Sequence, residues 1–108
     1  MARGIMVVQS SPVSPDREDE FNDWYDNIHV PEICSVPGFV SARRYKVPGT
    51  EAEGGGVPAY LAIYEIEADD LDAPVAEWRA RSAARLTTGT RALRLDPPPV
   101  VTIYELLA

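Results

Sequence analysis

The chain has 108 residues, of which 45% are hydrophobic and 25% are charged, and its formal net charge is −7. This length supports one hydrophobic core, so we expect a single domain over residues 1–108. The negative charge argues against nucleic acid or an anionic membrane as a partner, because binding of phosphate groups requires a basic surface. One cysteine, Cys34, cannot form an intramolecular disulfide, which favours a cytoplasmic location. The apolar run after Met1 is too short for a signal peptide, and no run is long enough for a membrane span.

The hydrophobic pattern of the first half predicts a strand followed by a helix. A short apolar run at residues 4–9 predicts the strand. Pro31 disfavours helical geometry at the preceding residue, so the helix is expected to run from residue 16 to about His29. Apolar residues recur with a helical spacing of i, i+3, i+4 and i+7 and predict a buried face formed by Phe21, Trp24, Tyr25 and Ile28.

The second half predicts two strands, a helix and a final strand. Alternating side chains predict strands at residues 39–47 and 59–67, joined by a loop with glycines at 54–56. In the first of these strands, alternation groups Phe39, Ser41, Arg43 and Tyr45 on one face; in the second, it groups Tyr60, Ala62, Tyr64 and Ile66. Asp69 or Asp70 is expected to cap a helix whose apolar stripe contains Leu71, Val75, Trp78, Ser82 and Leu86. Three prolines then precede the last strand, residues 100–107.

The order β-α-β-β-α-β is that of the ferredoxin-like unit, an α+β fold. We expect one four-stranded antiparallel sheet with two helices on one face, where an acidic first helix and a basic second helix would attract each other. The other face would carry apolar side chains and at least two of Tyr45, Tyr60, Tyr64 and Tyr104. A homodimer whose two sheets pack face to face would bury this patch. A monomer with a polar and aromatic sheet face in water is the alternative.

Three segments carry a family resemblance: EFNDWYDNIHVPE, VPGFVSARRY and YLAIYEI. Together they resemble the dimeric α+β barrel superfamily, and within it the EthD-like branch (ethyl tert-butyl ether degradation protein family). The resemblance covers nearly the whole chain and implies a dimer with a ligand pocket between each sheet and its helices. Muconolactone-isomerase-type relatives have a functional histidine near the end of the first helix, a position that His29 matches. The resemblance also implies cofactor-free chemistry on a small organic molecule, although the superfamily includes haem-binding members.

His29 is the only histidine and the only side chain whose unperturbed pKa lies near neutrality, which makes it a candidate general acid or base. Asp26, one helical turn earlier, or Glu32, just after Pro31, could hydrogen-bond one ring nitrogen and leave the other for a substrate proton. The alternative is a structural role, in which His29 caps the end of the helix.

An arginine and several aromatic side chains are candidates for the rest of the site. Arg43 and Arg44 are neighbours on a strand and point to opposite faces; alternation with Tyr45 favours Arg43 as the catalytic member that binds a carboxylate or enolate. The candidate substrate-binding residues are Tyr25, Tyr45, Tyr64, Trp78 and Tyr104. For each of them the alternative role is plain packing. This alternative is strongest for Trp78, which, like Trp24, lies on the apolar stripe of a predicted helix. One histidine and one cysteine do not make a zinc site, and no nucleotide-binding or serine-hydrolase motif is present, so we expect no metal and no cofactor.

Two functions from different classes are open. The first is a cofactor-independent enzyme: a cyclase, isomerase, dehydratase or monooxygenase acting on a small aromatic or polyketide-like carbonyl compound in a pocket near His29. The second is a non-catalytic dimer that binds a small hydrophobic molecule or is associated with stress. A titratable histidine beside two carboxylates favours the first, and an incomplete catalytic constellation in the sequence favours the second.

Overall fold

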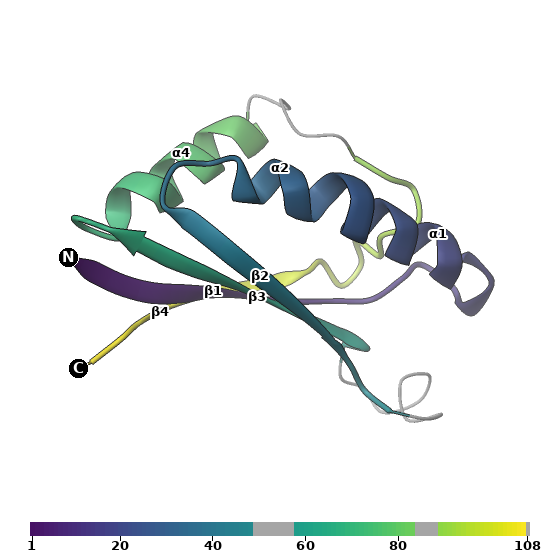
Figure 1. The fold of residues 1–108 in the computed structure, drawn as a ribbon. Helices are drawn as coiled ribbons and strands as arrows, with labels where there is room; N and C mark the ends of the chain where they lie inside the picture. Colours follow the sequence, from purple (N-terminus) through teal and green to yellow (C-terminus); the bar gives the residue numbers. More distant parts are fainter. Residues whose placement is uncertain (49–57, 84–88, 108) are drawn as a thin grey trace.

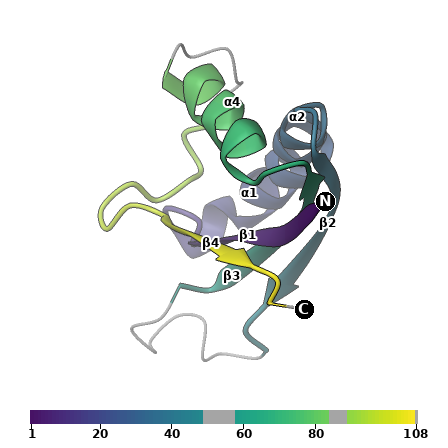
Figure 2. The same cartoon turned by 90° about the vertical axis from the view of Figure 1, so that its left-hand side faces the viewer.

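Four strands form one antiparallel sheet in the computed structural model, which describes residues 1–48, 58–83 and 89–107. The strands are β1 (Ala2–Ser10), β2 (Phe39–Lys46), β3 (Tyr60–Ala68) and β4 (Val100–Glu105), and their order in the sheet is β2-β3-β1-β4. All the helices lie on one side of the sheet (Figures 1 and 2). The predicted ferredoxin-like α+β fold is therefore confirmed. The predicted loop tip at 54–56 and the predicted stripe residue Leu86 lie outside the described residues.

The two central strands supply much of the core. β1 and β3 pair along their whole length, from Ala2 opposite Ala68 to Ser10 opposite Tyr60. The alternation predicted for β3 is confirmed, because one set of side chains is buried under the helices and the other set faces away. The buried set on these two strands contains Met6, Val8, Tyr60, Ala62, Tyr64 and Ile66.

The first helix does not end at His29, as Pro31 had led us to expect. It runs through η1 (Pro15–Arg17), α1 (Glu18–Trp24), the π-helical turn η2 (Tyr25–His29) and α2 (Val30–Cys34). The backbone N–H of Val30 donates to the carbonyl of Tyr25, five residues earlier, so the turn is one residue wider than an α-turn. Pro31 directly follows this wide turn, and because proline has no N–H it donates no backbone bond back into the turn.

The wide turn changes which side chains of this helix are buried. Phe21, Trp24 and Tyr25 are buried as predicted, but Ile28 is 37% exposed. The prediction for Ile28 was wrong because it assumed α-helical spacing through a turn that has a longer period. Because the π-helical turn contains one residue more than an α-turn, His29 takes a half-buried position and Ile33, in the next turn, lies in the core.

The second helix, α4 (Asp72–Ala83), begins where the sequence predicted. The carboxylate of Asp70 accepts a hydrogen bond from the backbone N–H of Ala73 at 3.0 Å, a capping interaction. Val75 is buried, and Leu71 and Trp78 pack partly buried against the core. Ser82 is exposed, so its predicted place on the buried stripe was wrong; a short hydroxyl side chain near the helix end gains little from burial.

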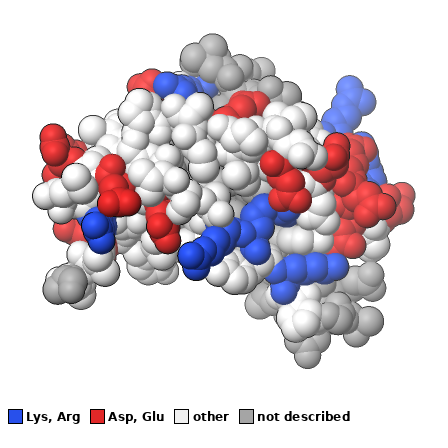
Figure 3. Space-filling model, in the orientation of Figure 1, with Lys and Arg blue, Asp and Glu red and all other residues white. Residues whose placement is uncertain are grey.

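Charged groups of the first helix meet cations of β2. Glu18 pairs with Lys46 at 3.0 Å and Asp26 pairs with Arg44 at 2.7 Å. Figure 3 shows acidic side chains gathered at the α1 end of the molecule and a band of basic side chains over β2. These ion pairs connect the helix to the edge of the sheet.

The sheet face away from the helices is mixed: it has an aliphatic centre, with charged side chains such as Arg43 and Glu65 beside it. The partly buried side chains of Ile5, Val7, Leu61 and Ile63 lie on it, and the exposed rings of Tyr45 and Tyr104 (48% and 54%) lie on its two edge strands. The expectation that at least two tyrosines occupy this face is confirmed. No helix within the described residues is both long and apolar enough to cross a membrane.

Candidate functional site

A β-bulge at the start of β2 inverts the alternation of this strand. Phe39 pairs with Ile66 of β3, but Ser41 pairs with the next residue of β3, Glu65, so the register shifts between them. The extra residue is Val40, which is 52% exposed. Side chains that follow the bulge therefore lie on the face opposite to that expected by counting from Phe39.

The bulge decides which arginine faces the helices. Arg44 lies opposite Ala62, on the face that the helices cover, and its side chain is only 15% exposed. Arg43 and Tyr45 are exposed on the other face. The structure does not bring Arg43 to His29, so the choice of Arg43 as the pocket arginine was wrong.

The guanidinium group of Arg44 is held between the sheet and the first helix. Its Nη1 donates to Asp26 Oδ1 at 2.7 Å and its Nη2 donates to Asn22 Oδ1 at 2.9 Å. Its central carbon lies 4.3 Å from the centroid of the Tyr25 ring and 5.3 Å from that of the Tyr60 ring, within the range of cation–π attraction.

A chain of polar contacts continues from Arg44 along the helix. The side-chain amide of Asn22 donates to the Tyr60 hydroxyl at 3.0 Å. That hydroxyl donates to the carboxylate of Glu18 at 2.5 Å, and Glu18 pairs with Lys46. The network ties the N-terminal half of the first helix to β2 and β3.

His29 is held between two aromatic rings of its own helix. Its imidazole stacks on Trp24 with centroids 4.4 Å apart and an interplanar angle of 20°, and it meets Tyr25 nearly edge-on at 4.9 Å and 84°. The Nδ1 atom is buried and has no hydrogen-bond partner among the described residues. Asp26, one of the two carboxylates that could have held His29, is bonded to Arg44 instead, whereas Glu32, the other, acts on the imidazole through its charge. Because the helix continues past His29, its predicted role as a C-terminal cap was also wrong.

The surroundings of His29 favour a neutral imidazole. Burial lowers the pKa of His29 from 6.5 to about 4; the charge of Glu32 opposes this effect and the charge of Arg44 adds to it. At neutral pH the ring is uncharged, so one of its nitrogens carries no proton. The described residues contain no group of three or more His, Cys, Asp or Glu side chains that could hold a metal ion.

The lowered pKa of His29 predicts acid sensitivity of the fold. Between pH 6.5 and pH 4 the unfolded chain binds a proton at His29 that the folded chain does not, so the free energy of unfolding falls as the pH falls. The shift from 6.5 to about 4 corresponds to a loss of about 3 kcal/mol between pH 7 and pH 4. In urea unfolding, His29→Phe should lose that much less stability than the wild type over this range. Parallel pH dependence of the two proteins would contradict the assigned burial of the imidazole.

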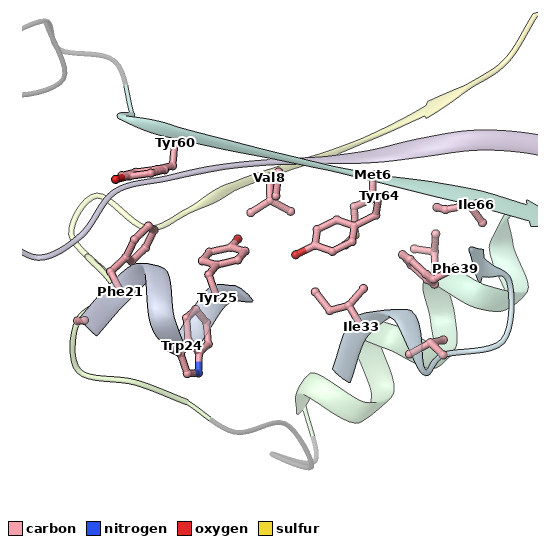
Figure 4. Packing of buried hydrophobic residues seen from close by; sticks show 14 of the residues in the cluster. Met6, Val8, Phe21, Trp24, Tyr25, Ile33, Phe39, Tyr60, Tyr64 and Ile66 are labelled. Carbon is pink, nitrogen blue, oxygen red and sulfur yellow. The ribbon is translucent and has the colours of Figure 1, made fainter. Parts of the chain in front are cut away.

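A second partnerless polar atom lies in the core near the same helix. The hydroxyls of Tyr25 and Tyr64 point toward one another between helix and sheet (Figure 4), and Tyr25 also interacts with the hydroxyl of the buried Ser10. The oxygen of Tyr64 nevertheless makes no hydrogen bond of normal geometry with the described residues. Burial raises the pKa of both tyrosines, which keeps both hydroxyls protonated and able to donate.

Removal of the Tyr64 hydroxyl should raise the unfolding free energy of the protein in the absence of any ligand. A buried hydroxyl without a partner costs about 1–3 kcal/mol, and phenylalanine fills the same space without that cost. We expect Tyr64→Phe to unfold at a higher urea concentration, with a gain in unfolding free energy of about 1 kcal/mol. Tyr25→Phe is the matched control, since it removes a hydroxyl that interacts with Ser10 and should lower stability. Equal losses in both variants would show that the Tyr64 hydroxyl is satisfied in solution.

The other predicted substrate-binding residues are divided between the two faces of the sheet. Tyr25 and Tyr64 lie beneath the first helix with His29, whereas Tyr45 and Tyr104 lie on the uncovered face and do not join them. Trp78 lies on α4 and packs partly buried against the core.

Sequence reasoning missed three residues that the structure places at or beside this site: Asn22, Ser10 and Arg44. Asn22 and Ser10 carry no pattern that distinguishes them from ordinary polar residues of a helix and a strand end. Arg44 was considered beside Arg43, but the register shift that selects it depends on pairing with β3 and has no signal in the sequence of β2 alone.

A family model described as a domain of unknown function, DUF4286, matches residues 8–91. The chain belongs to the DUF4286 family. This match runs from within β1 to the segment after α4 and so includes every residue of the His29 site. No curated protein matches the DUF4286 chain.

Solved structures share the fold of the DUF4286 chain at low sequence identity. A candidate monooxygenase from Shewanella loihica PV-4 has a TM-score of 0.60 at 13% identity, covering 100% of this chain and 98% of that one. An EthD family protein from Bacillus halodurans C-125 has a TM-score of 0.58 at 14% identity, covering 99% and 100%. An Arabidopsis thaliana protein has a TM-score of 0.58 at 18% identity, covering 97% and 96%. At this identity the likeness shows a shared fold, and the fold that the resemblance implied is confirmed.

Proposed function

We propose that the DUF4286 chain is a cofactor-independent enzyme that moves a proton on a small aromatic or polyketide-like carbonyl compound, with His29 as the base. The observation that supports this most directly is the buried Nδ1 of a neutral imidazole with no partner among the described residues. Native proteins rarely leave such an atom unpaired, and exceptions are often functional. A π-helical turn, which places His29, is also frequent at functional sites.

The reaction begins with enolisation. The neutral imidazole removes a proton from the carbon next to the carbonyl, the electron pair of the broken C–H bond forms a C=C bond, and the π electrons of the carbonyl move onto its oxygen. The hydroxyl of Tyr64, a protonated donor without a partner among the described residues, stabilises the resulting enolate oxygen. The enolate can close a ring on a second carbonyl, regain the proton at another carbon, or expel a hydroxide that leaves as water with that proton. These are cyclase, isomerase and dehydratase outcomes. In a monooxygenase the same enolate carbon would add O₂ and take up the proton to form a hydroperoxide, which loses water with the second hydrogen of that carbon and leaves a new carbonyl, so the substrate supplies all the electrons.

We also propose that the functional unit is a homodimer. The support is the uncovered sheet face, whose centre is formed by aliphatic side chains of β1 and β3. Face-to-face packing of two such sheets removes these aliphatic side chains from water, although it also brings Arg43 and Glu65, which lie on the same face, to the interface.

Deuterium exchange tests the proposal whatever the natural substrate is. The purified protein is incubated in D₂O with a panel of aryl ketones and aryl 1,3-diketones, and loss of the α-proton is followed by NMR. Exchange above the buffer rate for members of the panel supports the proposal. Binding of panel members by thermal shift, with no exchange in any of them, would reject it.

The second candidate function is binding without catalysis. The observation that favours it is the low pKa of His29, about 4, because a weak base gives a small driving force for proton removal. The absorbance spectrum of the purified protein distinguishes this case, since a bound coloured metabolite would be visible directly. A binder would show such a ligand or thermal stabilisation and no deuterium exchange.

A further inference from the structure

We infer that Arg44 is a positioning residue for His29, which acts through the ring of Tyr25 and does not contact the substrate. This inference rests on the proposed role of His29. It concerns a residue that strand alternation had ranked below its neighbour Arg43.

The register of β2 delivers the Arg44 side chain to the helix. After the bulge, Arg44 lies directly opposite Ala62 of β3, on the covered face of the sheet. Alanine is small and 2% exposed, so the long arginine side chain can lie over it and reach the first helix. An arginine at this place links the edge strand to the helix that holds His29.

Three contacts fix the guanidinium group in one orientation. Asn22 and Asp26 are four residues apart on the helix and accept one hydrogen bond each, from Nη2 at 2.9 Å and Nη1 at 2.7 Å. The planar group lies over the Tyr25 ring at 4.3 Å. With both terminal nitrogens engaged and the side chain only 15% exposed, Arg44 is built to hold protein groups, not a ligand.

Tyr25 connects Arg44 to His29. The ring of Tyr25 is contacted by the guanidinium at 4.3 Å and meets the imidazole at 4.9 Å. Trp24 stacks on the imidazole at 4.4 Å and also meets Tyr25 nearly edge-on at 5.1 Å. Loss of the guanidinium would release one side of Tyr25, and the imidazole orientation that depends on Tyr25 would change with it.

The only histidine of the chain gives an unambiguous probe of this orientation. In ¹H–¹³C NMR at pH 7.5 we expect the ring current of the stacked Trp24 to displace the Cε1–H signal of His29. We expect Arg44→Gln to move this signal toward the position of free imidazole. Arg43→Gln is the matched control, because it makes the same change one residue away on the opposite face and should leave the signal in place. An unmoved signal in Arg44→Gln, or equal movement in both variants, would overturn the inference.

Kinetics separate positioning from substrate binding. With the diketone that exchanges fastest, Arg44→Gln should lower kcat about 10–100-fold with little change in KM, as expected for a misplaced base. A rise in KM alone would assign Arg44 to substrate contact and overturn the inference. If the wild type catalyses no exchange but the NMR signal still moves in Arg44→Gln alone, the proposed function fails while the positioning role stands.

A second variant covers the case in which Arg44→Gln does not fold. Asp26 is 60% exposed, so Asp26→Ala removes one anchor of the guanidinium at little cost to the core. The His29 signal should move in the same direction, by a smaller amount, because Asn22 still holds Nη2. An unchanged His29 signal in folded Asp26→Ala would count against the inference.

Discussion

Replacement of His29 by alanine is expected to lower turnover of the exchange reaction by about 10²–10⁴-fold, the usual contribution of a positioned base. The stability should change little. The variant loses the ring contacts with Trp24 and Tyr25, but it also removes a buried nitrogen that has no partner among the described residues, and the two effects oppose each other. Exchange kinetics and a melting curve of the same preparation measure both.

His29→Phe is the control for shape. Phenylalanine retains a ring that can stack on Trp24 and removes both nitrogens, so it should be as inactive as His29→Ala while preserving the packing of the helix. Activity retained in His29→Phe would mean that the ring serves packing alone. Activity retained in His29→Ala would exclude the imidazole from the chemistry altogether.

Introduction of a charge at the centre of the uncovered sheet face should separate the proposed dimer. Val7 lies on the central strand β1, with Ile63 beside it on β3 and Thr102 beside it on β4, so neither of its paired neighbours is a cation. In a two-fold symmetric interface, Val7→Glu buries a carboxylate twice. Each unpaired buried carboxylate costs several kcal/mol, and we expect the dimer dissociation constant to rise by at least about 10³-fold.

Sedimentation velocity over a concentration series measures this change. Ala76→Glu, on the exposed side of α4, adds the same charge away from the sheet and should leave the association state unaltered. Circular dichroism should show the same secondary structure in both variants, because Val7 is only partly buried in the subunit. A wild type that sediments as a monomer throughout, or a Val7→Glu variant that remains dimeric, would refute the proposed face-to-face arrangement.

The sequence predicted those parts of the fold in which a repeating pattern runs without interruption. β3 alternates without a break, and the side chains predicted to share a face do so, from Tyr60 to Ile66. The cap at Asp70 was recognisable because its carboxylate bonds to a backbone group three residues away, an interaction encoded locally. Local rules of this kind depend on few residues and can be recognised in a single chain.

The errors arose where the backbone inserts a residue into a repeat. Counting from Phe39 placed Arg43 toward the helices, and a bulge set by pairing with β3 placed Arg44 there instead. Counting from Phe21 placed Ile28 in the core. The π-helical turn instead leaves Ile28 exposed and brings His29 to the edge of the core. Both insertions lie near tertiary contacts between distant residues, such as the bonds from Arg44 to the helix, and periodicity within one segment does not report such contacts.

The π-helical turn also makes the direction of the imidazole depend on chain length. If deletion of one residue from Tyr25–His29 converted the wide turn into an α-turn, each later side chain would be rotated by about 100° about the helix axis relative to Trp24. Such a shortened protein would keep its secondary structure while the imidazole lost its place between the two rings. In related sequences, the number of residues between the tryptophan and the proline should therefore be a more reliable marker of this site than the identity of the residues in between.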